Sequence, residues 1–188
     1  MKITLKDGSV LEYNEAKTAA DITKDISMGL FRNATCCKIN GEVKDLRTVI
    51  DTDASLEILT FDDEDGRKAF NHTASHIMAQ AVKRLYPEAK LTIGPAIDNG
   101  FYYDFDVEKS FSPEDLTKIE AEMKKIVKEN PEIKRFELPV DEAIALMESK
   151  NEPYKIELIK EHAEKGEPIS FYEQGEFTEL CAGPHLMD

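Results

Sequence analysis

The apolar and polar positions of the N-terminal third predict short strands arranged around one helix. Alternating apolar residues on both sides of an Asp7-Gly8 turn indicate a hairpin over residues 1–13. Apolar residues at spacings of three and four then predict a helix over residues 18–30. Further strands are expected over residues 35–39 and 56–61. This order of elements indicates a small β-grasp-like module.

The remaining residues alternate between helical and strand patterns, after an acidic stretch at residues 62–66 that we take as a domain boundary. Ser112-Pro113 opens one of these helices with a capping signature. The pattern predicts an α+β domain over residues 63–188, with helices packed on a mostly antiparallel sheet. The expected helices cover residues 70–87, 112–130, 141–150 and 153–165, and the expected strands cover residues 90–93, 101–105, 134–138, 169–172 and 176–181.

The helix predicted over residues 70–87 carries His72 and His76 one turn apart. Its apolar residues form one face, and both histidines are expected off that face, among small residues. The segment CAGPH, far along the chain, supplies Cys181 and His185. Two solvent-exposed histidines are the simplest interpretation of such a pair. The small neighbours and the distant Cys–His segment favour a site that holds a metal ion or positions a reactive water.

Composition narrows the classes of function. The chain has 24 basic and 38 acidic residues, a net charge of −14, which argues against a general nucleic-acid-coating module but not against a locally bound nucleic acid. The sequence shows no apolar run that predicts a membrane span, and its N-terminus does not resemble a signal peptide. Three cysteines do not make a disulfide framework, so we expect a cytoplasmic location. The adjacent Cys36 and Cys37 are interpreted as packing residues on opposite faces of a strand.

The HTASH helix and the CAGPH segment, with Ile93-Gly94-Pro95 and the run from Asp98 to Phe105, make the chain resemble the N-terminal half of bacterial-type threonyl-tRNA synthetases. The resemblance covers essentially all 188 residues. Residues 1–62 resemble the TGS domain. Residues 63–188 resemble the editing domain shared with alanyl-tRNA synthetases, and we expect it to be truncated at its C-terminal end. The family's catalytic core, with its ATP and metal sites, is expected to lie outside this chain.

This resemblance implies an editing activity rather than aminoacylation: hydrolysis of the ester of seryl-tRNA mischarged on threonine tRNA. Glu179 stands where many family members carry an aspartate, which is one methylene shorter. The parent enzyme is expected to be a homodimer and the fragment a monomer, neither in contact with a membrane. The residues that match the family's editing site, and that we expect to be catalytic, are His72, His76, Lys155, Glu179, Cys181 and His185.

Several alternatives stay open from the sequence. His72, His76, Cys181 and His185 are an acceptable tetrahedral zinc set, and the matching residues of the alanyl relatives bind zinc, but we favour a metal-free, water-based site. Cys181 acting as a covalent nucleophile is a second alternative. The chain could also be a free-standing trans-editing hydrolase, or an interaction or regulatory module based on its TGS domain.

Basic and aromatic residues outside this set receive structural interpretations. The basic residues near the long helix are expected to form a solvated face rather than to contact tRNA phosphates, and the aromatic residues are expected in the sheet and core. These residues are Lys83, Arg84 and Lys90, and Tyr102, Tyr103 and Phe105. His162 is expected to be exposed on a charged helix.

Overall fold

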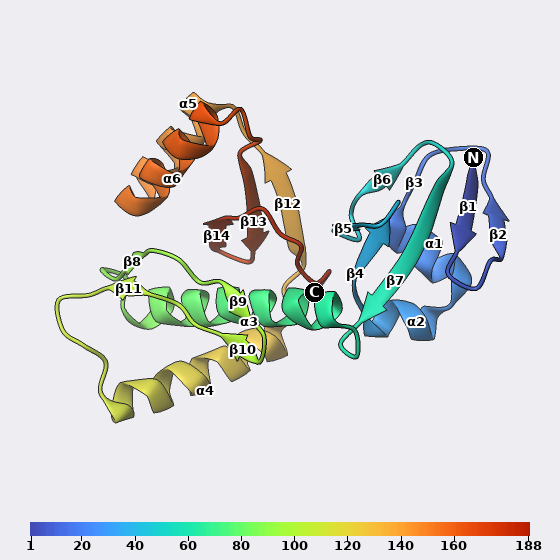
Figure 1. The fold of residues 1–188 in the computed structure, drawn as a ribbon. Coiled ribbons are helices and arrows are strands. Elements are labelled where there is room, and N and C mark those ends of the chain that lie inside the picture. Colours follow the sequence, from blue (N-terminus) through green and yellow to red (C-terminus); the bar gives the residue numbers. More distant parts are fainter. The chain divides into compact units, whose positions relative to one another are not determined.

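A computed structural model describes all residues 1–188, which form two compact units. The first comprises Met1–Thr73 with Gly183–Met187, and the second comprises Ala74–Ala182 with Asp188. Helix α3 (Glu64–Leu85) contributes its first turns to the first unit and its later turns to the second. Figure 1 labels the elements of both units. None of the helices is both long enough and apolar enough to cross a membrane.

The first unit is built on a mixed five-stranded sheet. Its elements are β1 (Lys2–Leu5), β2 (Val10–Glu12), β3 (Lys17–Thr18), α1 (Ala19–Ile26), α2 (Met28–Asn33), β4 (Ala34–Ile39), β5 (Glu42–Lys44), β6 (Val49–Ile50) and β7 (Ala54–Thr60). The sheet has the order β2-β1-β7-β4-β5 (Figure 1). The strands β1 and β2 form the predicted hairpin, and β1 runs parallel to β7. This arrangement confirms the β-grasp-like module.

The helix predicted over residues 18–30 is interrupted at Ser27. This residue separates α1 from α2, and its extended backbone (φ −168°) cannot continue a helix. The Ser27 hydroxyl accepts hydrogen bonds from the amides of Gly29 and Leu30, so it caps α2. The sequence does not indicate this break, because the apolar spacing continues across it and a serine inside a helical pattern is not by itself a stop signal.

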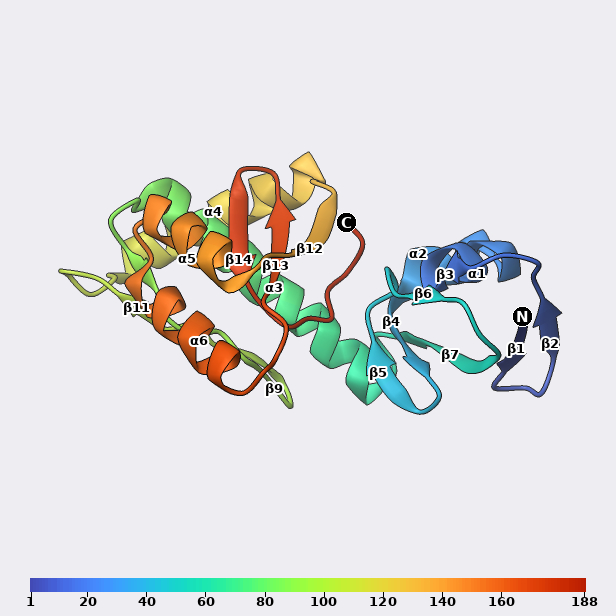
Figure 2. The ribbon, with the colours of Figure 1, turned by 90° about the horizontal axis from the view of Figure 1, so that it is seen from above.

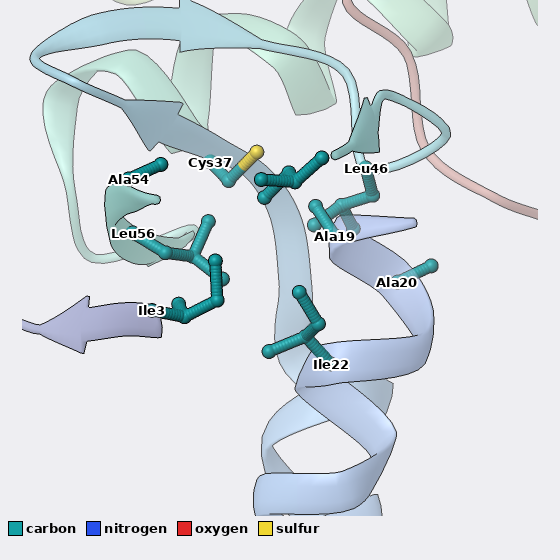
Figure 3. Close-up of a cluster of buried hydrophobic side chains, with 9 residues drawn as sticks. Ile3, Ala19, Ala20, Ile22, Cys37, Leu46, Ala54 and Leu56 are labelled. Atoms are coloured by element: carbon teal, nitrogen blue, oxygen red, sulfur yellow. The ribbon is translucent and has the colours of Figure 1, made fainter. Parts of the chain in front are cut away.

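The core of the first unit lies between α1 and the sheet (Figure 3). Ile22 of α1 points toward the strands that carry Ile3 and Leu56, and all three side chains are buried. Cys36 and Cys37 are fully buried but belong to separate apolar clusters, as expected for neighbours on opposite faces of a strand. Burial raises the pKa of each thiol to about 12, so both remain protonated packing residues.

The acidic stretch at residues 62–66 is partly helical rather than a linker, because α3 already begins at Glu64. Glu64 and Asp65 lie in the first turn of α3, where negative charge is favourable. Gly66 is required by a close approach, since a β-carbon there would lie 1.9 Å from the carbonyl oxygen of Thr60. This approach fixes the start of α3 against the end of β7.

The second unit combines helices with a three-stranded antiparallel sheet of order β12-β13-β14. Besides the later turns of α3, its elements are β8 (Lys90–Leu91), β9 (Ala96–Ile97), β10 (Gly100–Phe101), β11 (Phe105–Asp106), α4 (Pro113–Glu129), β12 (Ile133–Glu137), α5 (Val140–Ser149), α6 (Pro153–Glu164), β13 (Ser170–Gln174) and β14 (Phe177–Leu180). Helices α5 and α6 lie side by side (Figure 2) and share an apolar core with β13 through Met147, Ile159 and Phe171. The predicted α+β class is confirmed.

The structure differs from the predicted pattern in two segments of the second unit, the aromatic run at residues 101–105 and the apolar stripe of α4. The aromatic run at residues 101–105 is not one strand, because β10 pairs with β9 whereas β11 pairs with β8. The predicted apolar stripe of α4 is narrower than expected: Ile119 and Ile126 are buried, but Leu116 and Val127 are exposed. Only the innermost positions of this amphipathic helix therefore contribute to the core. The predicted capping box at Ser112 is confirmed.

Candidate functional site

Helix α3 places its two histidines in different environments. His76 is almost completely buried (3% exposed), whereas His72, one turn earlier, is half-buried. His76 packs edge-on against Phe177, with the ring centroids 6.3 Å apart. The expectation that both histidines lie away from the core therefore does not hold for His76. Their small neighbours Thr73 and Ala79 are buried as well.

His185 is buried and lies against His72 and Thr73 of the same helix. Its ring centroid is 4.3 Å from that of His72, and its Nδ1 atom is 2.9 Å from Thr73 Oγ1. The backbone amide of Leu186 donates a second hydrogen bond to the Thr73 hydroxyl, at 3.1 Å. Thr73, which the sequence suggested only as a small neighbour, therefore joins α3 to the segment that carries His185.

The four side chains predicted to hold a metal or a water form one cluster. His72, His76, Cys181 and His185 each offer one ligand atom, and these atoms all lie within 4.8 Å of one another. Around a tetrahedral zinc ion the ligand atoms would be roughly 3.3–3.6 Å apart. Around a tetrahedrally hydrogen-bonded water they would be roughly 4.6 Å apart. The donors fit zinc in kind, and separations of at most 4.8 Å between the ligand atoms are compatible with either a metal ion or a hydrogen-bonded water.

Lys155 and Glu179 form a buried ion pair in the second unit. The distance from Nζ to Oε1 is 2.5 Å, and the side chains are 5% and 2% exposed. Tyr103 completes this group, because its hydroxyl donates a hydrogen bond to Glu179 Oε2 at 2.5 Å. Burial, and then the neighbouring carboxylate, raise the pKa of Tyr103 well above its ordinary value, so the phenol remains a donor. Glu179 thus contacts the Lys155 ammonium group through Oε1 and accepts the Tyr103 hydrogen bond through Oε2.

Tyr103 is the residue that sequence reasoning missed, because the sequence indicated only a sheet or core role for it. The sequence signal that could have indicated it is Gly94, which directly follows the strand predicted over residues 90–93. A β-carbon at Gly94 would lie 2.0 Å from the Tyr103 ring, so only glycine lets the ring pass over the backbone. Ser75 of α3 donates a hydrogen bond to the Gly94 carbonyl oxygen at 3.1 Å, which fixes this crossing.

Cys181 directly follows β14 and is half-buried. Its backbone is held by Ser170, whose hydroxyl donates to the Cys181 carbonyl oxygen at 2.6 Å and whose own carbonyl accepts the Cys181 amide at 3.0 Å. None of the three cysteines is in a disulfide. The thiol is therefore presented by a fixed main chain at the end of a strand.

The basic residues on α3 are ion-paired rather than solvated. Lys83 is 2.8 Å from Glu152 Oε1 and also donates to backbone carbonyls. Arg84 contacts three carboxylates, those of Glu122, Glu129 and Glu176. A solvated basic face on this helix is therefore the wrong interpretation for both residues, and their charges are already balanced by carboxylates. His162 is only partly exposed and lies 2.6 Å from Glu167.

Comparison with known proteins identifies similar sequences over nearly the whole chain. The TGS domain family matches residues 1–60. The chain is 64% identical over 186 residues to the threonine–tRNA ligase of Acetivibrio thermocellus, and 63% identical over 187 residues to that of Clostridium perfringens (strain SM101 / Type A). The Clostridium tetani enzyme is 63% identical over 186 residues. These matches cover at least 99% of this chain and 29% of each relative, so the chain spans about three tenths of their length. Over nearly its whole length the chain is thus similar to threonine–tRNA ligases, and its residues 1–60 match the TGS domain family.

Proposed function

We propose that residues 63–188 act as an editing domain that hydrolyses the ester of seryl-tRNA mischarged on threonine tRNA. The observation that carries this proposal is the cluster of His72, His76, Cys181 and His185, whose ligand atoms lie within 4.8 Å of one another. A cluster of this size can hold a hydrogen-bonded water, which is the nucleophile that ester hydrolysis requires.

Selection by size explains why such a site is useful in this family. Serine lacks one methyl group of threonine, and one methyl contributes only about 1–3 kcal/mol to discrimination at a synthetic site. A second site that accepts the smaller product and hydrolyses it removes the error. Buried small residues beside the histidines, Thr73 and Ala79, support a tight pocket of this kind.

The residues divide the work as follows. His72, which is half-buried, holds or deprotonates the water. Cys181 and Glu179 position the seryl hydroxyl and amine, and Glu179 is itself held between Lys155 and Tyr103. Lys155 stabilises the negative charge that develops on the ester oxygen during the attack of water. The ion pair with Glu179 balances part of the charge of Lys155. His76 and His185 complete the water site from its buried side.

Zinc is the second candidate for the same cluster, because its three histidines and one cysteine are donors that the ion prefers. If it binds, His72, His76, Cys181 and His185 would hold it, and it would supply Lewis acidity to the site. Elemental analysis of the purified chain decides between the two. We expect well under one zinc per chain, and a stoichiometric content after purification without added metal would overturn the water-based site.

A deacylation assay with seryl-tRNA and threonyl-tRNA tests the function directly. Seryl-tRNA should be hydrolysed, threonyl-tRNA should survive, and His72→Ala or Cys181→Ala should each reduce the rate by at least about a hundredfold. His162→Ala is the matched control, because this histidine lies on a different helix and contacts Glu167 instead. Unchanged hydrolysis in both site variants would sink the proposal.

The properties of the whole protein follow from the family and are proposals as well. We propose threonine tRNA as its partner, a cytoplasmic location, and a homodimeric parent enzyme whose ATP-dependent ligase core lies outside this chain. Residues 1–62 would form the TGS domain of that enzyme. Co-purification of this chain with threonine tRNA, measured against an unrelated tRNA, tests the first of these statements.

A further inference from the structure

The backbone of residues 185–187 is held by two side chains of the N-terminal β-grasp module. Arg47 donates hydrogen bonds to the carbonyl oxygens of His185 (3.3 Å), Leu186 (2.8 Å) and Met187 (3.3 Å). The carboxylate of Asp45 accepts the amide of His185 at 3.2 Å. Figure 3 shows the C-terminal segment as a pale red ribbon passing beside the loop that carries Leu46. Four hydrogen bonds therefore fix three consecutive residues, all within the first unit.

The loop that provides these side chains is rigid. Leu46, between Asp45 and Arg47, is completely buried in the core of the first unit, and its carbonyl oxygen accepts the amide of Ala20 at 2.8 Å. Asp45 closes the turn twice: its backbone carbonyl accepts the Thr48 amide at 3.0 Å, and its side chain accepts the Arg47 amide at 2.8 Å. The positions of both charged side chains are thus set by the module's core.

Charge and donor geometry explain why these two residue types are present. The side chains of Arg47 and Asp45 are 15% and 8% exposed, and they pair at 2.9 Å, so neither charge is buried without compensation. A guanidinium offers five donors in a fixed planar fork, enough to reach three carbonyls and one carboxylate together. A lysine ammonium has only three donors on one atom, so it could not make the same set of contacts.

The held segment carries His185 into the cluster described above. The His185 ring lies beside that of His72, and its Nδ1 atom lies beside the Thr73 hydroxyl. The backbone amide of Leu186 donates a hydrogen bond to the same hydroxyl. We propose that Asp45 and Arg47 are positioning residues for His185, so that the TGS domain builds part of the editing site instead of only preceding it. This inference rests on the proposed function for its kinetic consequence, but not for its structural one.

Two variants and one control test it in this chain. Arg47→Ala removes all three carbonyl contacts, and Arg47→Lys keeps the charge opposite Asp45 while losing the fork. Arg32→Ala is the matched control, because Arg32 is an exposed arginine of the same unit in α2. The readouts are the ¹⁵N-{¹H} heteronuclear NOE of the amides at 185–187, and kcat and KM for seryl-tRNA hydrolysis.

We expect Arg47→Ala to lower the NOE at residues 185–187 and to reduce kcat about tenfold or more with KM within twofold, since misplacing a group by 1 Å can cost up to about a hundredfold in rate. Arg47→Lys should show a smaller change in the same direction, and Arg32→Ala none. If Arg47→Ala does not fold, Arg47→Lys decides the question. Undisturbed amides, or mobile amides with unchanged kcat, would overturn the inference. A wild-type chain without hydrolysis would instead refute the proposed function, and the NOE would still report whether Arg47 holds the segment.

Discussion

Two groups of ion pairs in the second unit bring a cation together with carboxylates, yet they differ in burial. The side chains of the Lys155–Glu179 pair are 5% and 2% exposed, and the phenol of Tyr103 also donates a hydrogen bond to Glu179. Arg84 is 24% exposed, and two of its three partners, Glu129 and Glu176, are at least half exposed. The Lys155–Glu179 group is therefore small and buried, whereas the Arg84 group is larger and partly exposed to solvent.

The difference shows which group the fold can do without. An exposed pair contributes little to stability, because solvent screens the attraction and ordering the side chains costs entropy. A buried pair contributes little on balance too, but breaking it leaves one charge without a partner, which is costly. Stability alone does not account for the buried contact between Lys155 and Glu179, and the proposed hydrolysis of seryl-tRNA gives this pair a role.

The largest expected effect is on Glu179. Glu179→Gln should destabilise the second unit by about 3–5 kcal/mol, because Lys155 would stay buried without its counter-charge. It should also remove hydrolysis of seryl-tRNA. Urea denaturation and the deacylation assay measure the two effects. Glu129→Gln, which removes an exposed partner of Arg84, should cost under about 1 kcal/mol.

A double variant separates burial from function. Lys155→Met with Glu179→Leu replaces the pair by apolar side chains, and it should be more stable than Glu179→Gln alone, while remaining inactive. Equal losses of stability in Glu179→Gln and Glu129→Gln would mean that burial does not distinguish the two groups.

An intermediate effect is expected at Gly94. Gly94→Ala places a β-carbon 2.0 Å from the Tyr103 ring, so the ring and its hydrogen bond to Glu179 must shift. Overpacking of this kind costs about 1–3 kcal/mol, and the rate of hydrolysis should fall with it. Thermal unfolding and the deacylation assay measure these changes.

Gly29→Ala is the matched substitution for Gly94→Ala. A β-carbon at Gly29 would meet only the Ser27 hydroxyl, at 3.4 Å, and the residue lies in α2 without a positive φ. It should be neutral or slightly stabilising, because alanine favours helix more than glycine does. If the Gly94→Ala protein is as stable and active as Gly29→Ala, the position of the Tyr103 ring does not depend on glycine at residue 94.

The sequence was sufficient for features that depend on local pattern. The β1–β2 hairpin, the capping box at Ser112 and the separate packing of Cys36 and Cys37 all follow from periodicity and turn residues. The break at Ser27 did not, because its signal is a single side chain that competes with a continuous apolar pattern. Local propensity cannot rank those two signals.

Contacts between segments that lie far apart in the sequence were also not predicted. The partners of Lys83 and Arg84 are carboxylates up to about ninety residues away, which no spacing rule predicts. Tyr103 was missed for the same reason, since its hydroxyl meets a carboxylate on β14. The four-residue spacings of His72 with His76 and of Cys181 with His185 indicated each half of the cluster, and the chemistry of the four side chains, together with the family resemblance, joined the halves.

The smallest expected effect is the pH dependence of the Arg84 network. Hydrogen bonding to Arg84 lowers the pKa of Glu176 from an ordinary 4.5 to about 2. A carboxyl group whose pKa is lowered by folding stabilises the native state above its unfolded pKa, and this contribution is lost as the pH falls toward the folded value. Arg84→Met should therefore be less stable than wild type at pH 7, by under about 1 kcal/mol because Glu176 is more than half exposed, and the difference should shrink between pH 4.5 and pH 2. Lys118→Met, which removes an exposed helical pair of the same charge type, controls for net charge. If the urea midpoints of Arg84→Met and Lys118→Met change in parallel across this pH range, the three carboxylates do not stabilise the protein by sharing the Arg84 guanidinium. The Lys155–Glu179 pair would then be the one group of this comparison whose charges affect the stability of the fold.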